Sequence, residues 1–237
     1  MGSKLSVVAG NLQRVRDRIA AAARRSGRAA DEVDLLPVTK TVGVDEIRVL
    51  LDLGVRRVGE SRVLDAAKKA AAFASDDLEW HLIGHLQRNK VSRAIEVFSF
   101  LHSLDSVRLA QALSGELVRR GRSLPCLLEV NTTREPQKHG FRPDELRAAA
   151  DAVALLPGLR VEGLMTMAML CEDPEEARPC FALLRELAQE LRLRDVPNLR
   201  MKHLSMGMSQ DFEVAVEEGA TVVRVGTALL EGVEHAE

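Results

Sequence analysis

Leu35-Leu36-Pro37-Val38-Thr39-Lys40 is the stretch from which the fold of this chain is predicted. Residues 33–39 resemble a short buried strand because they are rich in branched and apolar side chains. Gly43 interrupts the pattern, and a segment with helical periodicity follows it. Lys40 therefore stands where a buried parallel strand meets its loop. In an α/β barrel, this end of the strands carries the chemistry.

Lys40 is a candidate nucleophile. Apolar neighbours make a lysine amine easier to deprotonate, and the neutral amine attacks carbonyl compounds to form a Schiff base. Most lysines are solvated surface charges. The prediction for Lys40 therefore depends on which other residues gather at the same end of the strands.

Segments with strand and helix patterns alternate along the whole chain. Strands are expected at residues 33–39, 55–58, 80–83, 97–101, 126–130, 159–164, 203–206 and 221–225. Strict alternation implies parallel strands joined by right-handed crossovers. The 237 residues are close to the length of about 250 that is typical of one eight-stranded barrel. We therefore expect an α/β fold with one domain over residues 1–237, a single (β/α)8 TIM barrel.

An extra helix is predicted before the first strand. Its apolar side chains recur at helical spacing, so we expect it to pack on the outside or the base of the barrel: Val8, Leu12, Val15, Ile19 and Ala22. A second helix is expected to begin at Pro143. The alternative fold is a doubly wound open sheet, but its G-x-G-x-x-G turn after the first strand is missing.

Composition excludes several classes of protein. The net charge of −2 and the 3% of aromatic residues give no basis for nucleic-acid binding. No apolar run approaches the ~18 residues of a membrane span, and the arginine-rich N-terminal segment is not a signal peptide. The three cysteines have no C-x-x-C spacing, which suits a reducing compartment. We expect a cytoplasmic protein with neither a membrane nor a nucleic-acid partner.

Two loops near the C-terminal end of the chain predict an anion site. Ser205-Met206-Gly207-Met208-Ser209 follows the seventh strand, and Arg224-Val225-Gly226-Thr227 spans the end of the eighth. Each leads into a helix, where exposed backbone N–H groups bind anions. Barrels often bind phosphate after these two strands. The alternative interpretation, that Ser209 and Thr227 are simple helix N-caps, is less favoured because both loops occupy the positions that barrels use.

A lysine and a phosphate site on one rim suggest an aldehyde or ketone that carries a phosphate. Pyridoxal 5′-phosphate fits, with Arg224 placed to meet the pyridine nitrogen. A class I aldolase acting on a sugar phosphate fits the same two features. The residue pattern leaves both alternatives open.

The chain also resembles the pyridoxal phosphate homeostasis protein family. The matching segments run in family order from about Leu35 to Glu231. They are residues 38–40 (Val-Thr-Lys), 59–61 (Gly-Glu-Ser), 80–90, 102–105, 130–131, 138–141, 163–167, 204–209 and 223–227.

The resemblance implies a barrel of the alanine-racemase N-terminal-domain type (fold type III) that binds pyridoxal phosphate. Lys40 matches the family's Schiff-base lysine, and Arg224 matches the residue that faces the pyridine nitrogen. The residues that match the family's phosphate region are Ser205, Gly207, Ser209, Gly226 and Thr227. The residues that match its pocket walls are His81 and Met165.

Ser61 departs from the family pattern, which usually has asparagine after Gly-Glu. A hydroxyl is shorter than an amide and has one donor. We expect the contact of this position with an oxygen of the cofactor ring to be lost or bridged by water.

The resemblance favours a non-catalytic carrier that binds pyridoxal phosphate and releases it, with cofactor-dependent apoenzymes as recipients and a monomer as the expected state. The related two-domain racemases use a tyrosine from a second domain as their second base. This chain has no tyrosine, and only about one helix follows the eighth strand. The alternative is a racemase-like enzyme or a class I aldolase. No metal site is expected, because His81 and His85 lie on either side of a strand end and Gly84.

Overall fold

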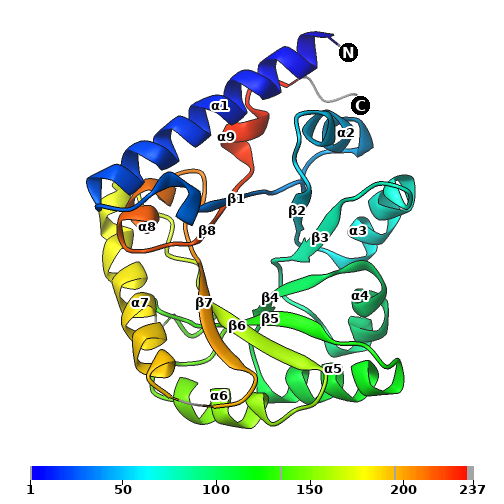
Figure 1. Ribbon diagram of the computed structural model, residues 1–237, viewed down its shortest axis with the longest axis vertical. Helices are drawn as coiled ribbons and strands as arrows, with labels where there is room; N and C mark the ends of the chain where they lie inside the picture. Colours follow the sequence, from blue (N-terminus) through cyan, green and yellow to red (C-terminus); the bar gives the residue numbers. More distant parts are fainter. Residues whose placement is uncertain (1, 134, 195, 234–237) are drawn as a thin grey trace.

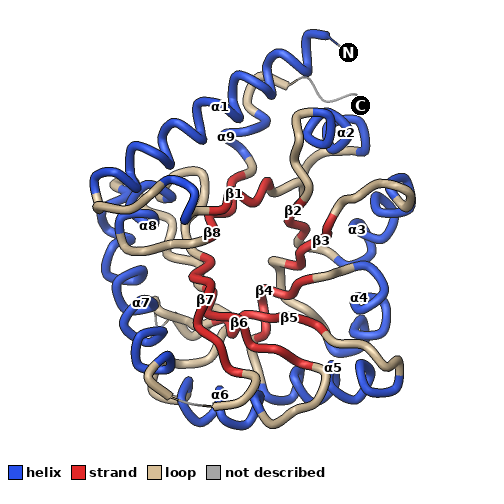
Figure 2. Tube along the Cα trace, in the orientation of Figure 1, coloured by secondary structure: helices blue, strands red, loops and turns tan. Residues whose placement is uncertain are grey.

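Eight parallel strands form one sheet that curves into a nearly closed barrel (Figures 1 and 2). The computed structural model describes residues 2–133, 135–194 and 196–233. The strands are β1 Asp34–Pro37, β2 Arg57–Glu60, β3 Glu79–Leu82, β4 Phe100–Leu104, β5 Leu124–Glu129, β6 Leu159–Met165, β7 Leu199–Ser205 and β8 Val222–Val225. They pair in the order β1-β8-β7-β6-β5-β4-β3-β2.

A short contact between β1 and β2 closes the ring. Val38 and Gly59 form an isolated parallel bridge, and the Thr39 amide donates to the Gly59 carbonyl at 3.0 Å. Because β1 also pairs with β8, the first strand has a neighbour on each side. This pairing confirms the barrel and excludes the open doubly wound sheet.

An outer layer of helices covers the strands (Figure 2). The α-helices after β1 are α2 Val44–Asp52, α3 Val63–Ala70, α4 Val91–Val97, α5 Val107–Arg119, α6 Leu146–Ala154, α7 Arg178–Arg192, α8 Phe212–Glu217 and α9 Thr227–Leu230. Short 3₁₀ turns are η1 Ala30–Glu32, η2 Ala71–Phe73, η3 Arg88–Lys90 and η4 Pro174–Ala177. Between helices and strands lies one large core of buried apolar side chains.

The extra N-terminal helix is confirmed as α1 Gly2–Arg25, which lies on the outside of the barrel along α8 and α9 (Figure 1). The five apolar side chains expected on its inner face are all buried. The Asn11 amide donates to the carbonyls of Leu229 and Glu231 at 3.0 and 2.9 Å. Asn11 therefore ties α1 to the segment that follows β8.

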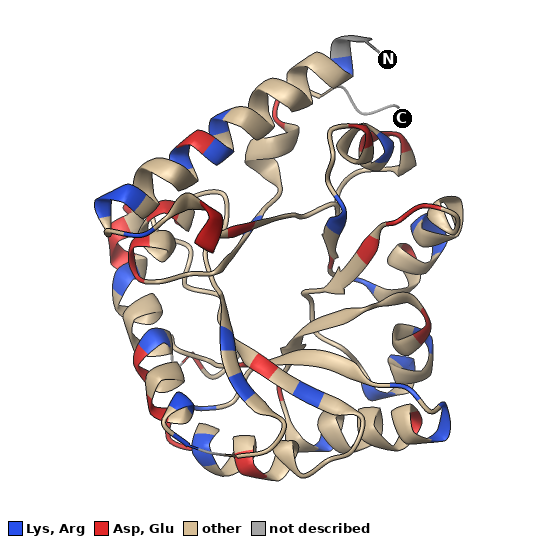
Figure 3. Cartoon of the chain, in the orientation of Figure 1, with Lys and Arg blue, Asp and Glu red and all other residues tan. Residues whose placement is uncertain are grey.

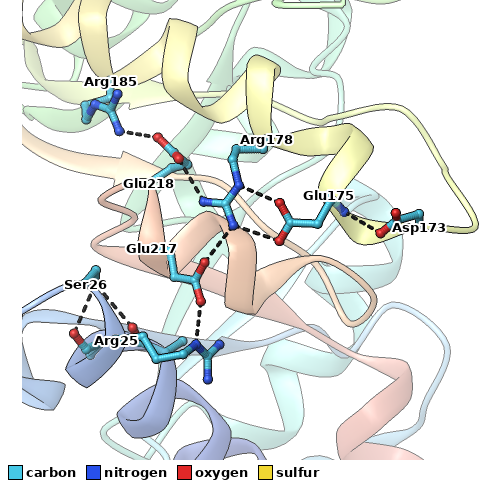
Figure 4. A network of polar contacts seen from close by, with 10 residues as sticks. Arg25, Ser26, Asp173, Glu175, Arg178, Arg185, Glu217 and Glu218 are labelled. Atoms are coloured by element: carbon cyan, nitrogen blue, oxygen red, sulfur yellow. Dashed lines mark hydrogen bonds and ion pairs between the residues drawn. The ribbon is translucent and has the colours of Figure 1, made fainter.

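Ion pairs join α1 to the helices around β7 and β8 (Figure 4). Arg178 contacts three carboxylates: Glu175 at 2.6 Å, Glu217 at 2.7 Å and Glu218 at 2.9 Å. Arg25 of α1 reaches Glu217 at 2.6 Å. Hydrogen bonds to these carboxylates raise the pKa of Arg178. Because the pairs share partners, they form a network and not isolated surface contacts.

Several predicted boundaries are wrong, among them those of α6, β4 and β7. Residues 143–145 form a turn, and α6 begins at Leu146 instead of Pro143. The fourth strand is Phe100–Leu104, because α4 continues to Val97. The seventh strand begins at Leu199, four residues earlier than expected. Its first half alternates buried and exposed residues, so it lacks the continuous apolar run that indicates a buried strand.

Charged positions of both signs are mixed along α7, whereas those of α1 are mainly basic, with Asp17 as its acidic residue (Figure 3). Within the described ranges, no helix combines the length and the apolar character that crossing a membrane requires.

Candidate functional site

Lys40 lies just past the carboxyl end of β1, as the sequence predicts. Val38 and Thr39 are buried, whereas Lys40 is exposed in a turn. The expectation of apolar neighbours around its amine is therefore wrong, because the chain turns outward immediately after Thr39.

A buried carboxylate holds the strand end that carries Lys40. Glu60, at the end of β2, is 1% exposed. It accepts hydrogen bonds from the Thr39 hydroxyl at 2.7 Å and from the Lys69 ammonium at 2.8 Å. Lys69, from α3, also donates to the Thr39 carbonyl at 2.8 Å. The sequence analysis missed Lys69, since a lysine in an alanine-rich helix looks like any solvated charge.

Arg224 is a cation buried inside the barrel, 3% exposed. It donates to the Ser205 hydroxyl and to the Thr166 carbonyl, both at 2.7 Å. Burial lowers the pKa of Arg224 to about 10, while Asp211 and Glu129 act in the opposite direction. Among the described residues, no ion pair or hydrogen bond joins Arg224 to a carboxylate. Its positive charge is therefore available to an acceptor on a ligand.

Ser205 has different contacts from those that the sequence suggested. It is fully buried, and its hydroxyl meets Arg224 and, at 2.9 Å, the Nδ1 of His102. The structure thus shows Ser205 fixing the guanidinium of Arg224, and its side chain is already occupied. These contacts argue against Ser205 as a phosphate ligand.

His81 lies deeper in the barrel than a wall of the rim site would. Its Nδ1 is 3.0 Å from the Nε2 of His102. It also lines a cavity of about 290 Å³ with the first residues of β1, β2 and β3, Asp34, Arg57 and Glu79. This cavity opens at the amino ends of the strands, opposite to Lys40. The sequence gives the strand of His81 but not the depth at which its side chain lies.

The histidines extend the contacts of Arg224 through the barrel. Burial holds the pKa of His102 well below its usual value, so the ring is neutral. A neutral imidazole accepts at one nitrogen and donates at the other. His102 can accept the Ser205 proton at Nδ1 and donate from Nε2 to His81. The Ser205 hydroxyl and the neutral ring of His102 therefore help to orient Arg224.

The loops after β7 and β8 meet at Ser209. Its hydroxyl accepts from the backbone amides of Gly226 and Ala228, each at the long distance of 3.4 Å. Gly207 has a φ of +90°, and an added Cβ would lie 2.6 Å from the Ala215 Cβ, so only glycine fits. Thr227 is exposed beside these amides. The loops thus present backbone N–H groups and two hydroxyls within one small region.

Met165 and Ser61 also lie at the carboxyl ends of strands. Met165 is the last residue of β6 and is fully buried. Ser61 directly follows β2 and is partly exposed. The predicted site residues that lie at or just after the carboxyl ends of strands therefore include Lys40, Ser61, Met165, Ser209 and Thr227.

Glu129, at the end of β5, is a titratable residue that the sequence analysis missed. It is 3% exposed, and burial raises the pKa of its carboxyl to about 7, with a smaller contribution from Asp105. The available signal was a carboxylate inside an apolar strand, in Cys126-Leu127-Leu128-Glu129-Val130. Strongly shifted groups of this kind gather at functional sites.

These residues fit a phosphorylated pyridine aldehyde. The loops at Ser209 and Gly226 supply anion-binding amides, Arg224 supplies a buried donor for a ring nitrogen, and Lys40 supplies an amine at the rim.

Comparison with known proteins gives a consistent result. The family model "Alanine racemase, N-terminal domain" matches residues 10–232. A pyridoxal phosphate homeostasis protein of Aquifex aeolicus is 43% identical, with 92% of this chain and 95% of the relative covered. A protein of the same name from Pseudomonas aeruginosa is 41% identical, with 95% of each chain covered.

Solved structures agree with these relatives. PipY of Synechococcus elongatus PCC7942 with PLP bound has a TM-score of 0.81 and 36% identity, covering 94% of this chain and 99% of that one. An alanine racemase of Clostridium difficile, 14% identical, shares the fold alone, with a TM-score of 0.73; the match covers 94% of this chain but 55% of the racemase.

Proposed function

Because this chain belongs to the pyridoxal phosphate homeostasis protein family, we propose that it binds pyridoxal 5′-phosphate and releases it to cofactor-dependent apoenzymes without catalysing a reaction of its own. The observation that carries the proposal is the buried Arg224, whose charge is held by neutral oxygens beside the converging loops of β7 and β8. The PLP-bound relative PipY supports the same cofactor.

Each part of the cofactor has a proposed partner. The amides of Gly226 and Ala228 and the hydroxyls of Ser209 and Thr227 bind the phosphate, and Gly207 allows the chain to approach it. Arg224 donates to the pyridine nitrogen, while Met165 and Ser61 lie beside the ring. When bound, the cofactor supplies an aldehyde that forms a reversible covalent bond with an amine. Lys40 is the amine that this chain offers at the rim.

The residues of the site support storage more than turnover. An arginine at the pyridine nitrogen disfavours a protonated ring, which weakens the ring as an electron sink. Racemisation also needs an acid or base within hydrogen-bond reach on each face of the substrate. The chain has no tyrosine, and Cys126 is buried with a pKa raised to about 12 by desolvation. Glu129 and Asp211 are the carboxylates whose charges act on Arg224. Of the two, Glu129 is the one whose pKa burial raises to about 7.

Reduction with borohydride tests the attachment. The full-length protein, loaded with pyridoxal phosphate and reduced, should carry one cofactor on the peptide that contains Lys40, as located by mass spectrometry. Lys40→Ala should lose this label, whereas the matched variant Lys202→Ala, an exposed lysine on β7, should keep it. Full labelling of Lys40→Ala at another lysine would show that the assignment is wrong.

Deuterium exchange tests the absence of turnover. The loaded protein is incubated with L-alanine in deuterated water, and we expect neither D-alanine nor deuterium at Cα. Turnover that is abolished in both Lys40→Ala and Glu129→Gln would identify an enzyme that uses Glu129 as its second base.

Transfer to a partner and the oligomeric state are measured separately. The loaded protein should restore activity to an apoenzyme that depends on pyridoxal phosphate, and light scattering should give the mass of a monomer, 26.0 kDa. The free cysteines Cys126, Cys171 and Cys180 suit a role in the reducing cytoplasm.

A further inference from the structure

Two histidines and an aspartate from three loops converge at the rim of the barrel. His85 follows β3, Asp105 follows β4, and His139 lies in the loop after β5. One potential ligand atom from each residue lies within 4.8 Å of the others. None of the three belongs to the proposed cofactor site.

The distances between these atoms suit one metal ion. The Nδ1 of His85 is 2.7 Å from the Oδ2 of Asp105, and the Nδ1 of His139 is 3.8 Å from the same oxygen. Ligand atoms about 2.0–2.1 Å from a tetrahedral zinc ion stand about 3.3 Å apart. These two separations lie on either side of this value, so the side chains have to rotate for all three atoms to contact one ion.

The pair involving His139 argues against a purely hydrogen-bonded cluster. Its separation of 3.8 Å from Asp105 is too long for a hydrogen bond. The two imidazole rings are also stacked, with centroids 3.9 Å apart and planes 9° apart. Binding of one ion by both rings therefore needs a rotation that lets a nitrogen of each ring face the same point, and the exposed side chain of His139 has room for it.

The backbone around each ligand is held in place. The carbonyl of Gly84, next to His85, accepts a hydrogen bond from Ser103 at 2.6 Å, and a Cβ on Gly84 would lie 2.4 Å from the Ser61 carbonyl oxygen. Gly140, next to His139, has a φ of +113°, and a Cβ there would lie 2.8 Å from the Asn131 nitrogen. Both loops can therefore hold their histidines only with glycine beside them.

Asp105 is the most buried of the three residues. Its side chain is 8% exposed. Its second oxygen, Oδ1, accepts a hydrogen bond from the Ser106 hydroxyl at 3.0 Å, which leaves Oδ2 facing both rings. Hydrogen bonds of this kind orient the ligands of metal sites.

From this geometry we propose that His85, Asp105 and His139 bind one divalent transition-metal ion, such as Zn²⁺. Two imidazoles and one carboxylate suit zinc, iron, nickel or copper better than calcium or magnesium, which prefer oxygen ligands. Three protein ligands leave at least one coordination position open to water or a small ligand. The expectation of a chain without a metal site is revised on these three residues; the partners of His85 are Asp105 and His139, and His81 is not a ligand.

A cation in this position acts on the barrel interior. Burial is the main cause of the raised pKa of Glu129, and the negative charge of Asp105 also contributes. A metal ion bound to Asp105 would neutralise this charge and favour the ionised form of Glu129. The rim site is therefore electrostatically linked to the residues around Arg224.

Metal titration of the full-length protein without an affinity tag tests the proposal. Zn²⁺ is titrated by calorimetry, and Co²⁺ is followed by its visible absorption bands. We expect one ion per chain, with binding that weakens as the pH falls because histidine must be neutral to coordinate. His139→Asn and Asp105→Asn should each weaken binding at least tenfold, whereas His203→Asn, a histidine outside the cluster, should leave it unchanged.

Two further measurements keep the result independent of folding and of the cofactor. His139 is exposed, so His139→Asn should keep the thermal midpoint of the wild type. This variant therefore tests the metal site even if Asp105→Asn misfolds. Lys40→Ala should bind the metal as the wild type does, which separates this site from any metal held by pyridoxal phosphate. No stoichiometric binding, or equal affinity in His139→Asn, would overturn the proposal.

Discussion

Replacing Glu60 with glutamine should destabilise the fold through Lys69. The carboxylate of Glu60 is 1% exposed and accepts charged and neutral hydrogen bonds, from Lys69 at 2.8 Å and from Thr39 at 2.7 Å. Glu60→Gln keeps the size of the side chain but removes the negative charge. The side chain of Lys69 is only 14% exposed, so its ammonium would remain desolvated without an anionic partner.

The magnitude follows from the burial of the two partners. Breaking a fully buried ion pair costs about 3–5 kcal/mol, and a hydrogen bond to a charged group contributes about 1.5–3 kcal/mol. Because Lys69 keeps some contact with water, we expect Glu60→Gln to lower the unfolding free energy by about 2–3 kcal/mol, less than the loss of a fully buried pair. The backbone carbonyl of Thr39 still accepts from Lys69, which limits the loss.

Urea unfolding followed by tryptophan fluorescence measures the effect. Trp80 is the one tryptophan of the chain, is 5% exposed and packs 6.1 Å from the Phe73 ring, so its emission should change on unfolding. Lys69→Met alone should also destabilise, because it leaves the Glu60 carboxylate unpaired. The double variant Glu60→Gln/Lys69→Met should recover much of the stability, since it leaves no unpaired charge.

The double-mutant cycle makes the reasoning testable. A coupling free energy near zero between Glu60 and Lys69 would refute the claim that the pair acts as a unit. A loss below about 0.5 kcal/mol in Glu60→Gln would place the site among ordinary surface substitutions. The matched control is the exposed pair of Arg142 and Asp144, for which Asp144→Asn should change stability little.

Three further perturbations follow from the site. The pKa of Glu129 is raised to about 7, so between pH 4.5 and 7 the folded protein holds a proton that the unfolded chain has lost. The unfolding free energy should therefore fall by on the order of 2 kcal/mol as the pH rises through this window. Glu129→Gln should flatten this slope in urea unfolding at several pH values. Thr227→Val should weaken pyridoxal phosphate binding by about 1.5–3 kcal/mol in fluorescence titration but leave pyridoxal binding unchanged. Ser61→Asn should slow cofactor release to an excess of apoenzyme, because the longer amide restores a ring contact.

Each of these expectations has a contradicting outcome. An unchanged pH slope in Glu129→Gln would assign the proton to another group. Equal affinity of the wild type for pyridoxal phosphate and pyridoxal would rule out the phosphate site between Ser209 and Thr227. Faster or unchanged release from Ser61→Asn would mean that position 61 does not touch the cofactor.

Much of the fold and the rim could be predicted because the relevant signals are local. The hydrophobic periods of strands and helices can be read from neighbouring residues. The alternation of strands with helices along the chain implies parallel strands joined by crossovers. The carboxyl ends of parallel strands meet at one edge, so the positions of Lys40, Ser61, Ser209 and Thr227 follow from the order of elements. Segment Leu199–Met201 was missed because exposed Arg200 breaks its apolar run.

The amino-acid sequence by itself determined that this chain forms an eight-stranded barrel and that Lys40 and the loops after β7 and β8 lie at one rim. Only the tertiary structure decided what the interior residues do. Ser205 contacts His102, which is 103 residues away in the sequence, and Glu60 at the end of β2 contacts Lys69 of α3. His85, Asp105 and His139 come together from three loops. The contacts of a side chain inside a closed barrel depend on how far along its strand it lies and on which part of the ring it faces. Neither property can be read from the local hydrophobic period of the chain.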